Sequence, residues 1–170
     1  MHFSTQSIEN RNKPTNKFYD SFLYFNELDD LTNKKIISVI SNMRNTNIKK
    51  YSLYKSLDDI SLLNLSFRNG DDLHSQWTDN EEKLILPILV SNGYKPVSTI
   101  ASIKKNSFNN IIIPNNCDSL IIKNRWNMWI LVIYLKKSFT YNELEELVNE
   151  TNSYTKRGYM LGYGDATIKE

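Results

Sequence analysis

Eight apolar residues in succession, at positions 128–135, stand between the polar residues Asn127 and Lys136. The run is too short to cross a membrane. It is rich in β-branched and aromatic residues, which is typical of a strand that is buried on both faces. We therefore predict that residues 128–135 form the central strand of a sheet.

Shorter segments on both sides of this run also have the composition of strands. Leu63, Leu65 and Phe67 alternate with polar residues, which is the period of a half-buried strand. The four residues 124–127 are predicted to join the segment before them to the central strand as a hairpin. The other predicted strands are residues 51–54, 97–103, 109–113 and 119–123, and a short closing strand with a Gly-rich turn at 158–165.

Apolar residues at helical spacing predict helices in the N-terminal third of the chain. One stretch covers residues 18–31. The next places Ile36, Ile37, Ile40 and Met43 on one face.

Two further helices are predicted from capping boxes, in which a Thr precedes a Glu by three residues. Thr78 and Glu81 start one helix at residue 79, which Pro87 should kink and Gly93 should end. Thr140 and Glu143 start the other at residue 141, and we expect it to reach about residue 152. A hydrophobic staple between Phe139 and Leu144 supports this last prediction.

These patterns predict an α+β fold with a mixed or mostly antiparallel sheet of five or more strands and helices mainly on one face. Residues 1–17 are polar and are expected to form a flexible N-terminal arm, followed by a single domain over 18–170. Residues 51–104 and 119–169 also share Thr-x-x-Glu, Gly-Tyr and a small-residue-Ile-Lys tail. This similarity is either chance or a pseudo-repeat of two βαβ-like halves.

Composition excludes some classes of protein. The net charge of +2 does not indicate a strong binder of polyanions. Cys117 is the only cysteine, so no intramolecular disulfide can form. The first residues lack the apolar core of a secretory signal, and no apolar run is long enough for a membrane span. We therefore expect a cytoplasmic protein with no membrane partner.

Groups that could perform catalysis are sparse. Asp71, Asp72 and His74 could bind a metal beside a predicted turn, but no further His or Cys completes a ligand set, and a solvated turn is favoured. Cys117 is interpreted as an inert thiol because no histidine is near it in sequence. No nucleophile elbow and no phosphate-binding loop is present. We assign no catalytic residue, metal or cofactor, and the sequence favours a protein that is not an enzyme.

Lysine-containing doublets near tyrosines leave a nucleic-acid interface open, because cationic and aromatic side chains together bind single strands. The doublets lie at 34–35, 49–50, 104–105, 136–137 and 156–157. The pattern of exposed aromatics that an RNA-binding sheet requires is not evident, so a mixed-charge surface is favoured.

The loop before the central strand carries the functional prediction. Arg125 and Trp126 are of the types enriched at protein-binding hot spots, and the alternative is that the indole folds back over the sheet. The other candidate partner-binding residues are Asp71, Asp72, Tyr159 and Tyr163. We predict a non-catalytic protein-binding module, an inhibitor that neutralises another protein such as a toxin or a defence enzyme. The alternatives are a metal-dependent enzyme acting on nucleic acid or nucleotides, and a nucleic-acid-binding module.

Overall fold

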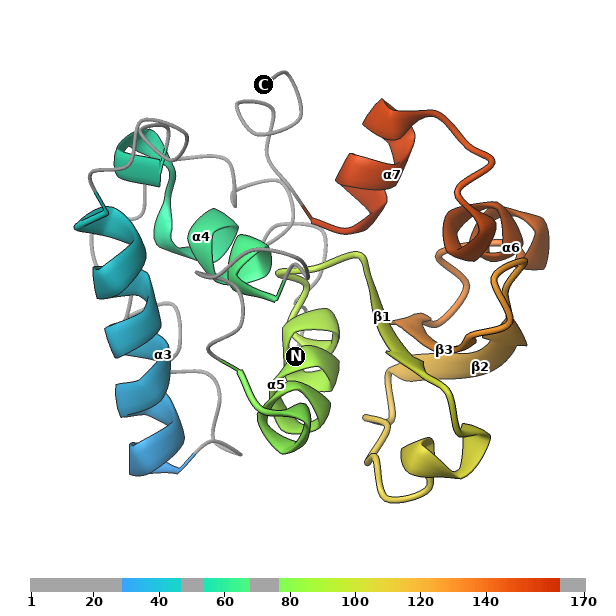
Figure 1. Cartoon of the computed structure of the whole chain (residues 1–170), viewed down its shortest axis with the longest axis horizontal. Coiled ribbons are helices and arrows are strands. Elements are labelled where there is room, and N and C mark those ends of the chain that lie inside the picture. The colour runs from blue at the N-terminus through green and yellow to red at the C-terminus, as the bar shows by residue number, and fades with distance from the viewer. Residues whose placement is uncertain (1–28, 47–53, 68–76, 163–170) are drawn as a thin grey trace.

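The computed structural model describes residues 29–46, 54–67 and 77–162. Within these ranges the elements follow the order α3 (Asp30–Arg44), α4 (Asp59–Ser66), α5 (Asp79–Ser91), β1 (Val97–Ser102), the 3-10 helix η3 (Lys105–Phe108), β2 (Cys117–Lys123), β3 (Trp129–Leu135), α6 (Tyr141–Asn149) and α7 (Tyr154–Met160). Figure 1 shows the sheet between α5 on one side and α6 on the other.

The prediction that the apolar run is the central strand is confirmed. The sheet has the order β1-β3-β2, and β3 pairs antiparallel with both neighbours. Val132 and Ile133 are fully buried, and they point to opposite faces because side chains alternate along a strand. The predicted hairpin between β2 and β3 is also confirmed.

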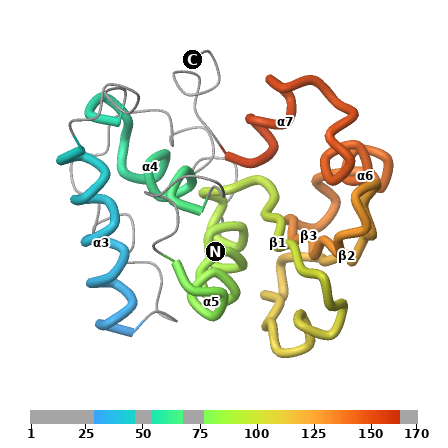
Figure 2. Tube along the Cα trace, in the orientation of Figure 1, coloured from blue at the N-terminus to red at the C-terminus, as the bar shows by residue number. Residues whose placement is uncertain are grey.

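Both faces of the sheet are covered, which corrects the prediction that helices lie mainly on one face. Ile100, Leu131 and Ile133 pack in one core cluster with α3, α4 and α5. Val97, Ile130 and Val132 pack in a second cluster with α6 and α7. A strand that is apolar on both faces needs two helical layers, and the traces in Figure 2 show them on either side of the sheet.

Helix starts follow the side-chain caps that the sequence provides. Thr78 and Thr140 each form a complete capping box with the Glu three residues later, as predicted. Pro87 lies inside α5, and Gly93 follows that helix with a φ of 78°. On α3, the buried residues are Ile36, Val39, Ile40 and Met43, while Ile37 remains 43% exposed.

The prediction of five or more strands is wrong, since the described residues form a sheet of three. The predicted strand at 63–67 falls on α4, which the Asp58 side chain caps by accepting from the backbone N–H of Ser61 at 2.7 Å. Every residue of α4 is buried. A helix that is surrounded on all sides shows no amphipathic period, so the short Leu63–Leu65 alternation was misleading.

Two other predicted strands are also absent from the residues that the structure describes. Residues 109–113 pair with no strand; Ile111 and Ile113 pack on the core while Ile112 is 84% exposed. The described part of 158–165 belongs mostly to α7, which Ser153 caps by accepting from the N–H of Lys156.

The two βαβ-like halves are not formed by the described residues. The Gly-Tyr pair at 93–94 leads into β1, whereas the pair at 158–159 lies within α7. The predicted arm over 1–17, most of the helix at 18–31, and residues 51–53 lie outside the described residues.

Candidate functional site

The hairpin between β2 and β3 has a closely defined backbone. The N–H of Asn124 donates to the carbonyl of Met128 at 2.9 Å, and the N–H of Asn127 donates to the carbonyl of Asn124 at 3.0 Å. The Asn124 side-chain oxygen also accepts from the N–H groups of Trp126 and Met128, both at 3.0 Å. Asn127 adopts a φ of 63°, a left-handed conformation that Asn tolerates well. Asn124 therefore fixes the turn that presents Trp126.

Arg125 and Trp126 form a stacked pair on this turn. The guanidinium carbon lies 4.3 Å from the centroid of the indole ring, and the Trp126 side chain is 50% exposed. The backbone N–H of Arg125 donates to Asn149 Oδ1 at 2.7 Å, so the end of α6 anchors the hairpin. The indole is not folded back into the core. We name Arg125 and Trp126 the hairpin pair.

A second cation–aromatic group lies at the same end of the sheet. The ammonium groups of Lys105 and Lys123 lie 4.9 Å and 5.5 Å from the centroid of Trp129. Lys123 and Trp129 are cross-strand partners. The two lysines form no ion pair with another described residue, and the same is true of Arg125. This end of the sheet therefore carries positive charge beside two tryptophans.

Tyr159 is separate from the hairpin pair. It lies on α7, is 38% exposed, and lines a shallow hollow with Pro96 and Phe139. Pro96 adjoins the end of β1 that pairs with Tyr134, whereas the hairpin adjoins the opposite end of β3. Tyr159 and Trp126 thus lie toward opposite ends of the sheet. The other predicted contact residues, Asp71, Asp72 and Tyr163, lie outside the described residues, as does His74.

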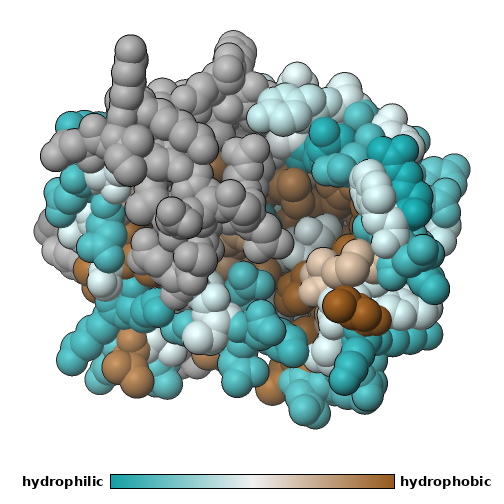
Figure 3. Space-filling view, in the orientation of Figure 1, coloured by the Kyte–Doolittle hydropathy of each residue, from teal (hydrophilic) through white to brown (hydrophobic). Residues whose placement is uncertain are grey.

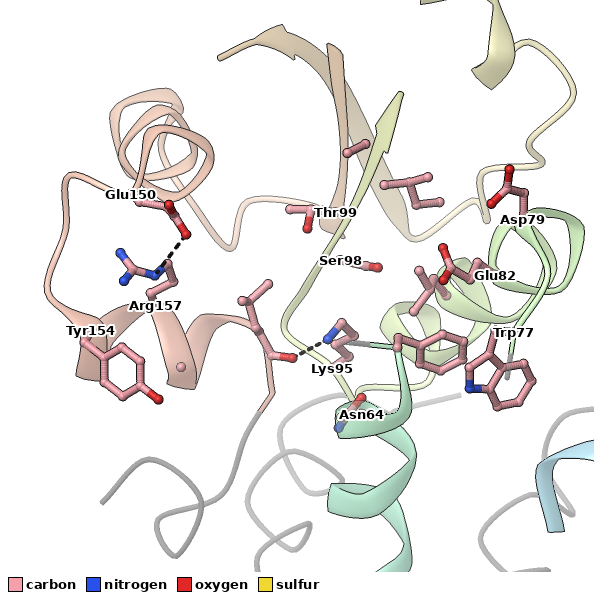
Figure 4. A pocket seen from close by; sticks show the side chains of 16 residues that line it. Asn64, Trp77, Asp79, Glu82, Lys95, Ser98, Thr99, Glu150, Tyr154 and Arg157 are labelled. Atoms are coloured by element: carbon pink, nitrogen blue, oxygen red, sulfur yellow. Dashed lines mark hydrogen bonds and ion pairs between the residues drawn. The ribbon is translucent and has the colours of Figure 1, made fainter. Parts of the chain in front are cut away.

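A concavity that sequence reasoning missed lies along the outer edge of β1. It has a volume of about 540 Å³ and lies between α5 and α7. We name it the β1 cleft. Figure 3 shows a hollow over this part of the sheet, with hydrophobic residues inside it and mostly hydrophilic residues along its right-hand side. Side chains that Figure 4 labels in the cleft include Asn64, Trp77, Asp79, Glu82, Lys95, Ser98, Thr99, Glu150, Tyr154 and Arg157.

Two buried polar atoms on the cleft lining have no hydrogen-bond partner among the described residues. They are the hydroxyl oxygen of Ser98 and the Oδ1 atom of Asn64, on side chains that are 0% and 1% exposed. Buried polar groups are normally satisfied, because an unmade hydrogen bond costs about 1–3 kcal/mol. Both residues line the cleft, so a polar group of a ligand bound there is a candidate hydrogen-bond partner for these atoms.

The charged groups of the cleft differ in how they are satisfied. Lys95, which is 4% exposed, donates to the carbonyl of Leu161, and Arg157 forms an ion pair with Glu150 at 4.0 Å. Asp79 and Glu82, on the first turn of α5, form no ion pair with a described residue. Burial, with a further contribution from Asp79, raises the pKa of Glu82 to about 7.

The one cysteine does not resemble a nucleophile. Cys117 is buried at the start of β2, and burial together with the nearby Asp118 carboxylate raises the pKa of its thiol to about 11. No group of three or more His, Cys, Asp or Glu side chains within the described ranges is arranged to hold a metal ion. Likewise, none of the helices described is both long and apolar enough to span a membrane.

The sheet, its two helical layers and the β1 cleft define the class of the molecule as an α+β protein with a three-stranded antiparallel sheet. Comparisons with protein-family models, curated proteins and solved structures found no match to the chain. The proposals below therefore depend on the residues of this chain alone.

Proposed function

We propose that this chain is a protein-binding module of the inhibitor type, and that the hairpin pair is part of the surface that contacts its partner. The observation that carries the proposal is Trp126, which is half exposed on a turn whose backbone is held by hydrogen bonds. The partner would be a toxin or a defence enzyme, which a toxin-immunity or counter-defence protein neutralises. Binding would bury the exposed half of the Trp126 indole.

The geometry of the hairpin favours binding energetically. Trp and Arg dominate hot spots, and truncating a hot-spot side chain costs about 2–4 kcal/mol of binding free energy. The Asn124 and Asn149 hydrogen bonds order the turn before a partner arrives, which lowers the entropic cost of association. Lys105, Lys123 and Arg125 form no ion pair with a described residue, so this end of the sheet suits a partner surface of negative charge.

The test is affinity capture from the native host with three forms of the full chain. Trp126→Ala removes the indole, and Tyr141→Ala is the matched control because Tyr141 is 54% exposed at the start of α6. We expect one protein to be captured by the wild type and by Tyr141→Ala, and its affinity to fall at least about thirtyfold in Trp126→Ala, which corresponds to 2 kcal/mol. Equal capture by all three forms would refute the role of the hairpin pair.

A single observation favours a second candidate, single-stranded nucleic acid. Trp129 lies beside both Lys105 and Lys123, and an indole flanked by cations is suited to base stacking and phosphate contact. The test is fluorescence anisotropy with a labelled 20-nucleotide strand at several salt concentrations. Binding that weakens steeply with salt and is lost in Lys105→Glu supports this candidate. Absence of salt-dependent binding would leave the protein-binding proposal alone.

A further inference from the structure

Within the part of the chain that the structure describes, β1 is an edge strand whose outer backbone groups are open. It pairs only with β3, and the groups on the other edge of Val97–Ser102 form no backbone hydrogen bond with another described residue. Open edges bind additional strands, in function or in aggregation. The outer edge of β1 is also the floor of the β1 cleft, to which Ser98, Thr99, Ile100 and Ala101 contribute.

The two edges of the sheet are protected differently. β2, at the opposite edge, carries the exposed charged residues Asp118 and Lys123, and such charges discourage edge-to-edge pairing. β1 has the sequence VSTIAS and carries no charge. Its protection comes instead from the neighbouring helices α5 and α7, which form the walls of the cleft (Figure 4). A backbone edge that lies between two helical walls favours a single extended chain over the edge of another folded sheet.

The walls also indicate the chemistry of the incoming chain. Across the cleft in Figure 4, Arg157 is engaged with Glu150, and Lys95 is engaged with Leu161. Asp79 and Glu82 on the opposite wall have no cationic partner within the described residues. A cation placed against α5 would supply a counter-charge to these carboxylates. A backbone beside β1 would lie close to the Ser98 hydroxyl, which has no hydrogen-bond partner among the described residues.

We propose that the β1 cleft binds an extended segment of a partner protein as a fourth strand beside β1, with a Lys or Arg side chain of that segment directed at Asp79 and Glu82. Backbone hydrogen bonds to β1 supply affinity that depends little on sequence, and the acidic wall supplies selection for the cation. The inference is separate from the hairpin proposal, because the cleft lies on β1 and the hairpin joins the other two strands.

The test uses a displayed library of random decapeptides, with the full-length chain as the target. Thr99→Trp places a large side chain in the cleft, and Glu82→Lys reverses the charge of the wall while leaving the strand unchanged. Asp118→Lys is the matched control, since it makes the same change of charge on the far edge of the sheet. Circular dichroism establishes whether each variant is folded. If Thr99→Trp does not fold, Glu82→Lys still tests the proposal.

We expect selected peptides to be enriched in Lys or Arg and to lack central Pro. Their affinity should fall at least about tenfold in Glu82→Lys, and remain within twofold of wild type in Asp118→Lys and Trp126→Ala. Bound peptide should slow amide hydrogen exchange in residues 97–102 at least about tenfold. If the Trp126→Ala variant still binds the peptides, the cleft binds independently of the hairpin pair. The cleft proposal and the hairpin proposal can therefore fail separately.

Four results would overturn the proposal. The first is a library in which no enriched peptide loses affinity in Glu82→Lys. The second is peptide binding that leaves the exchange of residues 97–102 unchanged. The third is stronger peptide binding in Ile168→Pro, which would assign the cleft to residues 163–170 of the chain itself. The fourth is a dimer in analytical ultracentrifugation that Glu82→Lys dissociates, which would assign the cleft to a second copy of the chain.

Discussion

The side-chain amide of Asn64 donates a hydrogen bond of 3.2 Å to the carbonyl oxygen of Gly162, which lies 98 residues further along the chain. The same nitrogen donates to the carbonyl of Tyr94, also at 3.2 Å. Asn64 lies on α4, in the layer on one face of the sheet, and Gly162 follows α7, in the layer on the other. One buried amide therefore joins the two helical layers beside the β1 cleft.

Asn64→Leu tests the energetic importance of this junction. The change keeps the approximate size of the side chain and removes the donor from two carbonyl groups, so we expect a loss of about 1–3 kcal/mol in the free energy of unfolding. Urea denaturation followed by circular dichroism measures it. Asn110→Leu, at an exposed position with no side-chain hydrogen bond to a described residue, is the control and should change stability by less than about 0.5 kcal/mol. An equal loss of stability from the two substitutions would contradict the stabilising role of the Asn64 hydrogen bonds.

Gly162→Ala tests the other side of the same contact. Gly162 has a φ of 97°, and an added Cβ would lie 3.2 Å from Asn64 Nδ2 and 3.3 Å from Lys95 Cγ. Backbone strain alone predicts a loss of about 1–2 kcal/mol. Gly93→Ala is a useful comparison, because Gly93 also has a positive φ, of 78°, at the end of α5. A Gly162→Ala protein as stable as wild type in urea would show that the loop relaxes without cost.

The sequence predicted the elements whose signals are local and complete. Thr78 and Glu81, like Thr140 and Glu143, satisfy each other's backbone groups within one turn, so both helix starts could be placed to the residue. The apolar run around Val132 identified the central strand, because burial on both faces requires a continuous run. The same run also implies a helical layer on each face of the sheet, whereas the prediction placed the helices mainly on one face.

Errors arose where packing determines the structure. Leu63 and Leu65 are buried in a helix that is surrounded on all sides, and such a helix has no polar face to reveal its period. Ser153 starts α7 without a Glu three residues later, so the sequence offered only half of the usual signal. In the candidate site, the exposed hairpin could be predicted because residues 124–127 are adjacent in sequence. The β1 cleft could not, since Asn64, Glu82, Ser98 and Arg157 come together only in the tertiary structure.

Glu82→Gln tests the pH dependence that the cleft confers on stability. The pKa of Glu82 is about 7 in the folded protein, against 4.5 for an ordinary Glu. A raised pKa means that ionisation opposes folding: the cost is absent below pH 4.5, grows between pH 4.5 and 7, and is complete above pH 7. We expect the Gln variant to be more stable than wild type by roughly 1–2 kcal/mol at pH 8, after allowing for solvent screening, and equal to it at pH 4.

Urea midpoints at pH 4, 6 and 8 measure this difference. Glu145→Gln, an exposed position on the solvent side of α6, is the control and should show no comparable trend with pH. A Gln variant whose advantage is the same at pH 4 and pH 8 would contradict the burial of an ionisable Glu82.

Cys117 provides a measure of opening at the first residue of β2. Its thiol is 4% exposed with a pKa of about 11, against 9.0 for an ordinary cysteine. At pH 8 the thiolate fraction is therefore lower by about a hundredfold, and steric burial slows reaction further. We expect a disulfide reagent to label the native protein slowly and the urea-unfolded protein at the ordinary rate.

The double variant Cys117→Ser with Asp118→Cys moves the thiol to the adjacent exposed position and should be labelled quickly without urea. Fast labelling of the native wild type would instead mean that the N-terminal end of β2 separates readily from Leu135, its partner on β3.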